Sequence, residues 1–144
     1  MKITIKQLPI GAEEEIIVMC NNISPELLNV LNSLKAQSNM LVAYINNDIH
    51  RLNSSDVFYF EAVDKKTFIY CESEVYESKL KLYELDEMEM SDFFRISKSV
   101  IVNLSKIKTL SPSFSGRVEA LLTNKERVII SRQYVSELKK ALGI

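Results

Sequence analysis

Short apolar runs separated by turn residues fill this chain from Met40 onward, and their spacing constrains the fold more than any other feature. The runs are rich in β-branched and aromatic residues, and Asn, Asp, Pro or Gly stand between them. They lack the spacing of the helical crossovers that join parallel strands. We therefore expect roughly nine or ten short antiparallel strands and three helices, which is a mainly β (α+β) architecture.

Two neighbouring pairs of runs have the form of β-hairpins. MLVAYI and IHRL flank Asn-Asn-Asp at 46–48, and VFYFEAV and TFIYCES flank Asp-Lys-Lys at 64–66. Asn and Asp tolerate the positive φ angles of tight hairpin turns, so both segments are expected to reverse the chain. Further strands are expected at 75–76, 95–98, 101–104, 107–110, 117–123 and 127–130, with turns at 112–116 and 124–125.

Three segments have helical patterns. Residues 24–37 open with Ser-Pro-Glu, which suits an N-cap and a first turn, and leucines then recur at helical spacing. Residues 79–90 place Leu and Met among acids and lysines, so the acids at 84–89 are expected to form a solvated helix face. The last helix should start at the N-cap Ser131 and stop at Gly143.

Residues 1–45 form a distinct N-terminal part of the sequence. Strand patterns at 2–8 and 16–20 precede the helix at 24–37, which predicts a small β-β-α extension in front of a larger domain at 46–144. An extension of this size is too small to be stable alone. Two arrangements stay open: the extension packs on its own domain, or it serves self-association or the docking of a partner.

Charge is polarised along the chain, although the whole chain carries only −1. Residues 93–144 contain ten Lys and Arg against three Asp and Glu, a net charge of +7, whereas residues 1–92 carry −8. Basic residues stand beside turns and at the start of the last helix, where free backbone amides also suit a phosphate. The residues alone leave two alternatives open, nucleic-acid binding and a set of solvated loops.

The sequence offers little for catalysis or for metal binding. Phosphate-binding glycine loops, HExxH and GxSxG are absent, and His50 stands in a strand pattern without a nucleophile nearby. Cys20 and Cys71 are too isolated for a zinc site and are expected to be buried free thiols. Neither an export signal nor a membrane span stands out, so we expect a cytoplasmic protein that is not an enzyme and needs no cofactor.

Three segments closely resemble one known family. FFRISKSVIVNLSKIKTL (93–110), VIISRQYVSELKKAL (128–142) and DVFYFEAVDKKTFIY (56–70) resemble motifs of the LytTR DNA-binding domain of bacterial response regulators. The motifs stand in the family's order, and the resemblance covers residues 49–144. It implies small antiparallel sheets rather than a helix-turn-helix. It also implies loops that enter successive major grooves of duplex DNA, with a minor-groove contact between them.

By the same resemblance, the family's DNA contacts fall on three loops of this chain. They are Lys65, Lys66 and Thr67 in the first loop, Ser97, Lys98 and Ser99 in the second, and Ser131, Arg132, Gln133 and Tyr134 at the start of the last helix. The first loop has no His, and the second has Lys where some members have Asn, which affects the bases that are read. Arg95 and Asn103 are expected to be scaffold residues, and Phe93, Phe94 and 100–102 core residues. Tyr134 fits packing at a helix start as well as a DNA contact.

The resemblance further implies a biological role. Residues 1–45 have neither the length nor the phosphoacceptor Asp of a receiver domain, so the chain looks like a standalone LytTR transcriptional regulator. Such a regulator is expected to act as a homodimer on repeated DNA sites, controlled by a small membrane protein rather than by phosphorylation. The competing hypothesis is a protein-binding adaptor module whose basic half docks on an acidic partner.

Overall fold

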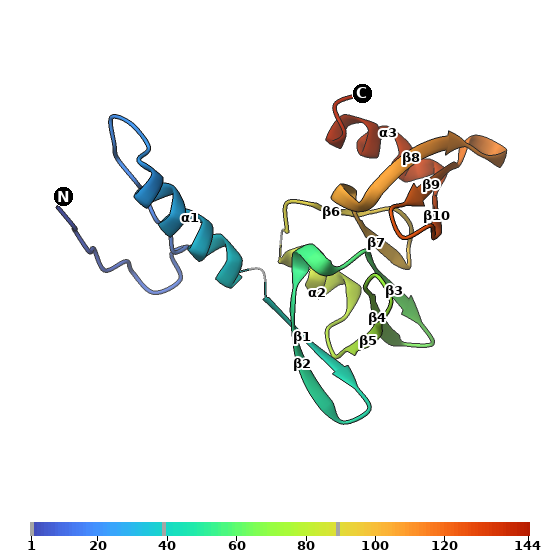
Figure 1. The fold of residues 1–144 in the computed structure, drawn as a ribbon, viewed down its shortest axis with the longest axis horizontal. Coiled ribbons are helices and arrows are strands. Elements are labelled where there is room, and N and C mark those ends of the chain that lie inside the picture. The colour runs from blue at the N-terminus through green and yellow to red at the C-terminus, as the bar shows by residue number, and fades with distance from the viewer. Residues whose placement is uncertain (1, 39, 89) are drawn as a thin grey trace.

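The computed structural model describes residues 2–38, 40–88 and 90–144. Ten strands in these residues form two sheets in which every pairing is antiparallel, and the helices lie around or beside the sheets (Figure 1). The mainly β (α+β) class predicted from the sequence is confirmed.

The larger sheet has seven strands in the spatial order β2-β1-β5-β4-β3-β7-β6. Both predicted hairpins are present, and their turns contain positive φ angles at Asn46 (55°), Asp64 (50°) and Lys65 (65°). Asn and Asp adopt this region more readily than most residues, which is why they stand there. The strands are β1 (Met40–Ile45), β2 (Asp48–Asn53), β3 (Tyr59–Val63), β4 (Lys66–Tyr70), β5 (Val75–Ser78), β6 (Phe93–Arg95) and β7 (Val100–Asn103).

The smaller sheet has three strands in the order β10-β9-β8, and α3 (Arg132–Ala141) follows it. Helix α3 begins directly after Ser131 and has its C-cap at Leu142. The next residue, Gly143, takes a φ of 77°, as the predicted helix stop requires. The strands are β8 (Ile107–Pro112), β9 (Val118–Leu122) and β10 (Arg127–Ile130), and the short 3-10 helices are η1 (Ser54–Asp56), η2 (Leu104–Lys106) and η3 (Phe114–Gly116).

The larger sheet separates two hydrophobic cores, because successive side chains of a strand point to opposite faces. Phe60 and Ile101 join a core that also contains Leu82 and Leu85 of α2 (Leu82–Glu87). The neighbouring Val102 joins the second core, which the smaller sheet and α3 complete with Ala120, Leu122, Val128, Ile130 and Leu138. The predicted core residues lie as expected: Ile101 and Val102 are buried, and Phe93, Phe94 and Val100 pack against the cores.

Helix α2 is shorter than the segment 79–90 predicted for it. Its N-cap Lys81 has extended φ and ψ angles, and the Glu84 carboxylate accepts a hydrogen bond from the Lys81 amide at 3.1 Å. This cap starts the helix at Leu82, so 79–81 lie outside it, and the helix ends before its C-cap Met88. Residue 89 lies outside the described residues.

The N-terminal part departs from the prediction. Residues 2–8 and 16–20 do not form strands, so that part of the β-β-α prediction is wrong. The alternation at 2–8 and the apolar run at 16–20 give a capacity to pair, but in the described residues no strand lies beside them. Helix α1 (Pro25–Ser38) does start as predicted, since the Ser24 hydroxyl accepts a hydrogen bond from the Leu27 amide at 3.2 Å.

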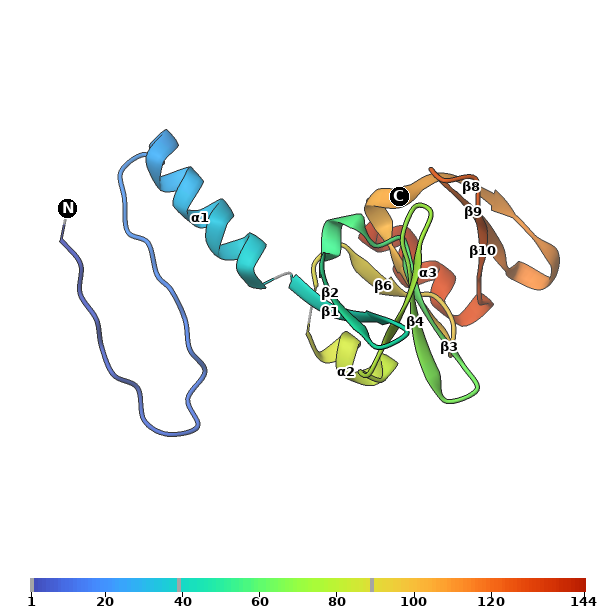
Figure 2. The same ribbon diagram turned by 60° about the horizontal axis from the view of Figure 1, so that its bottom comes forward.

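Helix α1 and the chain before it stand away from the two sheets (Figures 1 and 2). Among the described residues, neither core includes one that precedes Leu41, so the packing alternative is not observed. Strand β1 pairs with β2 and β5, which places 40–45 in the larger sheet rather than in the extension. The division of the chain into 1–45 and 46–144, with a separate role for the first part, stays a prediction. No helix in the described ranges is both long and apolar enough to span a bilayer.

The two cysteines are free thiols in different surroundings. Cys20 is exposed, so the prediction that both are buried is wrong for this residue. Cys71 is half-buried, and burial, assisted by the negative charges of Asp56 and Glu74, raises the pKa of its thiol to about 11. A thiol reacts as its thiolate, which Cys71 forms only at high pH.

Alkylation should therefore distinguish the two thiols. At pH 8 we expect iodoacetamide to modify Cys20 first and Cys71 much more slowly, as measured by intact mass against time. A Cys20→Ser variant should show only the slow phase. Equal rates at the two sites would contradict the protected position of Cys71.

Candidate nucleic-acid interface

The turn between β6 and β7 presents Lys98 on a rigid backbone. The Arg95 guanidinium donates hydrogen bonds to the carbonyls of Ser97 (2.7 Å) and Lys98 and also pairs with Asp86 of α2 at 2.7 Å. The Ser97 hydroxyl accepts a further bond from the Ser99 amide at 3.2 Å. Arg95 thus fixes the backbone of the turn while the Lys98 side chain stays exposed.

The start of α3 is joined to this turn. The Ser131 amide donates a hydrogen bond to the Ile96 carbonyl at 2.8 Å. This bond joins the N-cap of α3 to the beginning of the β6–β7 turn. Ser131 has the extended backbone of an N-cap, as predicted, but its side chain makes no capping hydrogen bond. The first turn of the helix therefore presents Arg132 and Gln133, both exposed, beside the positive end of the helix dipole.

A third segment, the turn between β8 and β9, completes a hollow around Lys98 and Arg132. A Cβ atom placed on Gly116 would lie 3.1 Å from Cδ of Arg132, so the stem of the arginine packs over this glycine. Ser115 and Arg117 stand on either side of Gly116. We call the hollow the basic groove; it is lined by Ser97, Lys98, Ser99, Ser115, Arg117, Ser131, Arg132 and Gln133.

The turn between β3 and β4 adjoins Lys98 from the other side. Lys65 and Lys66 are exposed, and a shallow hollow brings Lys65 near Lys98. Thr67 is only 3% exposed, because the strand alternation turns it inward, so its side chain is not presented to a partner. Lys81 donates from its ammonium group to the Lys65 carbonyl at 2.7 Å and adds a cation that the sequence motifs did not indicate.

Two of the turns lie along one side of the molecule. In Figures 1 and 2 the β3–β4 turn and the β8–β9 turn both project from the side opposite α1. Two of the three loops predicted from the sequence thus share the basic groove, and the first loop lies beside it. Ser115 and Arg117 were missed; their only sequence signal was a basic residue next to the predicted turn at 112–116.

The residues expected to be scaffold occupy buried or packed positions. Asn103 is 1% exposed; its amide donates to the Val57 carbonyl at 2.8 Å, and its side-chain oxygen accepts from the Ser105 amide (3.0 Å) and hydroxyl (2.7 Å). Tyr134 is half-buried against the second core. Asn103 therefore links η1 to η2, while Tyr134 packs against the core with part of its side chain still accessible.

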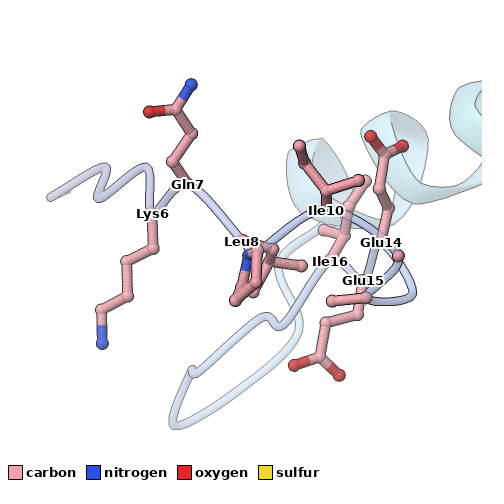
Figure 3. A pocket seen from close by; sticks show the side chains of 10 residues that line it. Lys6, Gln7, Leu8, Ile10, Glu14, Glu15 and Ile16 are labelled. Carbon is pink, nitrogen blue, oxygen red and sulfur yellow. The ribbon is translucent and has the colours of Figure 1, made fainter.

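Neither the hollow in the N-terminal segment nor the acidic and His side chains of the described residues form a comparable site. The hollow in the N-terminal segment lies inside a bend of exposed chain, where Lys6 and Gln7 point in opposite directions, as do Glu14 and Glu15 (Figure 3). Within 2–38, 40–88 and 90–144, no group of three or more His, Cys, Asp or Glu is placed to hold a metal ion. His50 is half-exposed in β2 with its ring edge-on to Tyr76. The basic groove is the site that the arrangement supports.

Comparison with known families identifies the domain. The LytTr DNA-binding domain profile matches residues 47–143, two thirds of the chain. This chain belongs to the LytTR DNA-binding domain family. The family recognised from three sequence motifs is confirmed, and so is the fold. The solved LytTr DNA-binding domain from Bacillus cereus matches with a TM-score of 0.70 and 30% identity, covering 74% of this chain and 98% of that domain.

Bacterial relatives of the LytTR chain are named as regulators. An uncharacterised "HTH-type transcriptional regulator" of Staphylococcus aureus strain NCTC 8325 is 35% identical over 118 residues, which is 82% of this chain and 80% of that protein. Its counterpart in strain MRSA252 is 34% identical over the same coverage. In the described residues of the LytTR chain, α1 precedes β1, α2 lies between β5 and β6, and α3 follows β10. No two of these helices are consecutive, so they do not form a helix-turn-helix pair.

Proposed function

We propose that this chain is a bacterial transcriptional regulator that binds specific duplex DNA at repeated sites. The basic groove supports this proposal most directly, because Lys98 and Arg132 come to it from separate elements with hydroxyl and amide groups beside them. Lys and hydroxyl groups suit phosphates, and Arg and Gln on a protruding element suit base edges. The proposed contacts are Lys65, Lys66, Ser97, Lys98, Ser99, Ser131, Arg132, Gln133 and Tyr134, while the buried Thr67 would support the first loop from inside.

Selection of bound duplexes from a random pool at physiological salt tests this function. We expect a recurring pair of sites, with an affinity that falls steeply as salt rises, because each neutralised phosphate releases counterions. Failure to enrich any duplex would instead favour the adaptor hypothesis, in which the basic half docks on an acidic protein. The proposed regulator acts in the cytoplasm, where the DNA is, without catalysis.

The N-terminal segment supports a proposal of self-association. Between residues 3 and 34 it exposes many large apolar side chains, and two strand-patterned runs there have no strand beside them in the described residues. Apolar surface of this extent is typical of an interface. We propose that a second copy of this chain covers these apolar side chains, since each unpaired run can pair with the same run of another copy. Light scattering of the full chain should then give the mass of a dimer. A monomeric mass would favour the small membrane protein that the family resemblance implies. The apolar residues are Ile3, Ile5, Leu8, Ile10, Ile16, Ile17, Val18, Met19, Ile23, Leu28, Val30 and Leu34.

Arg95 should influence DNA affinity through the backbone that carries Lys98. Arg95→Ala removes two bonds to carbonyls and a partly exposed ion pair, so we expect about 1–2 kcal/mol less stability and weaker duplex binding. Urea unfolding and a duplex titration measure the two effects. Arg127→Ala is the control, because Arg127 makes only a surface pair with Glu119 at 3.4 Å. Equal DNA affinity of the two variants would contradict a positioning role for Arg95.

A further inference from the structure

Phe114 is exposed in a way that no other phenylalanine of the chain is. Its side chain is 88% exposed, whereas the other five phenylalanines are buried or half-buried. It belongs to neither core, so the fold does not use it for packing. A single exposed apolar residue needs no explanation by itself; the turn that carries it supplies the reason to look further.

The turn around Phe114 is tightly closed. Ser115 and Gly116 both have left-handed backbone, with φ of 58° and 76°. The Ser113 amide donates to the Arg117 carbonyl at 2.9 Å, and the Arg117 amide donates back to the Phe114 carbonyl at 3.2 Å. Left-handed conformation is unfavourable for a residue such as serine, and such strain collects at functional positions. The aromatic ring is thus carried at the tip of a fixed turn.

The same turn forms a wall of the basic groove. Ser115 and Arg117 line the groove with Lys98 and Arg132, and Gly116 packs against the stem of Arg132. The turn projects from the side of the molecule that also carries the β3–β4 turn (Figures 1 and 2). Phe114 therefore belongs to the turn whose next residue, Ser115, lines the groove that contains these cations.

We propose that Phe114 is a further DNA contact, which packs against apolar atoms of the duplex beside the site read by Arg132. The proposal rests on the proposed DNA-binding function and adds an apolar contact, which the Lys and Arg side chains of the groove do not provide. Duplex DNA offers two sources of apolar atoms, thymine methyl groups and deoxyribose carbons, and phenylalanine is suited to the methyl group. Arg117, next to the same turn, would take a neighbouring phosphate.

Titrations of the full chain with its selected duplex over a range of salt test this contact. Phe114→Ala should weaken binding about tenfold, the scale of losing the partial burial of one aromatic side chain. The slope of log affinity against log salt should not change, because no charge is removed. Arg117→Ala should instead lower that slope by about one. Phe114→Leu should retain most of the affinity. Both Phe114 variants should melt like the parent, since the ring buries nothing.

Replacement of operator thymines by deoxyuridine, one at a time, distinguishes the two sources of apolar atoms. If Phe114 contacts a methyl group, one replacement weakens the parent and leaves Phe114→Ala unaffected; if it contacts sugar, no single replacement does so. Equal binding by the parent and Phe114→Ala would overturn this inference alone. If Phe114→Ala changed the oligomeric mass of the DNA-free protein but left its duplex affinity unaltered, Phe114 would be a contact between copies of the chain. That result would also overturn the inference. Failure of the parent to bind any duplex would overturn the proposed function as well.

Discussion

Arg132→Ala is expected to weaken binding of the full chain to its selected duplex by about ten- to a hundredfold. Arg132 opens α3, its guanidinium is exposed in the basic groove, and Arg is the side chain best suited to paired hydrogen bonds with a guanine edge. Loss of one such pair costs roughly 1–3 kcal/mol and should relax sequence preference at a single position. Competition titrations with single-base variants of the duplex measure both effects.

Lys98→Ala should give a different pattern of loss. If Lys98 contacts phosphate, all duplexes should bind more weakly by a similar factor, and the slope of log affinity against log salt should fall by about one.

Arg51→Ala is the matched control for Arg132→Ala, because Arg51 is exposed on β2, the edge strand farthest in order from β7 and β6. If the Arg132 and Lys98 variants both bound as tightly as Arg51→Ala, the site assignment would be wrong.

Asn103→Ala is expected to cause the largest loss of stability, about 3 kcal/mol. The substitution leaves the buried Val57 carbonyl without its 2.8 Å donor and removes the acceptor of two Ser105 groups. Buried polar groups without a partner cost roughly 1–3 kcal/mol each. Urea unfolding should show a lower midpoint with the same slope against denaturant.

Asn53 provides a matched control for Asn103. Both residues cap a 3-10 helix through a side-chain oxygen, but Asn53 is exposed and accepts only the Ser55 amide at 3.2 Å. Asn53→Ala should therefore cost about 1 kcal/mol, the usual scale of a lost cap. Similar losses for the two variants would show that burial does not govern the contribution of Asn103.

Local patterns in the sequence were enough to place most of the β framework. Asn46 and Asp64 mark hairpin turns because their own backbone preferences decide the conformation. Ser24 marks a helix start because its hydroxyl accepts a hydrogen bond from the first turn, and Ser131 stands at the other predicted start with an extended backbone but without that bond. The alternation at 2–8 indicated only that these residues could pair, and pairing needs a neighbouring strand that the local sequence cannot reveal. That is why this prediction was wrong.

The candidate site was less accessible to sequence reasoning, because it depends on contacts between distant segments. Strand alternation from the buried Ile69 would have turned Thr67 inward, so its burial could have been foreseen. Arg117 reaches the basic groove through the packing of the β8–β9 turn on α3, and no local pattern encodes that contact. The family motifs identified the segments that carry Lys98 and Arg132. Only the structure showed that the β8–β9 turn, with Ser115 and Arg117, lines the groove beside them.

The contact between Gly116 and Arg132 has a thermodynamic consequence for recognition. A long arginine side chain normally loses about 0.5–1.5 kcal/mol of rotamer freedom when a ligand immobilises it. Here the stem already lies against the backbone of the β8–β9 turn, with Cδ 3.1 Å from where a Cβ of residue 116 would stand. Part of that entropy is therefore lost when the protein folds. In the proposed complex, Arg132 reaches the DNA preorganised.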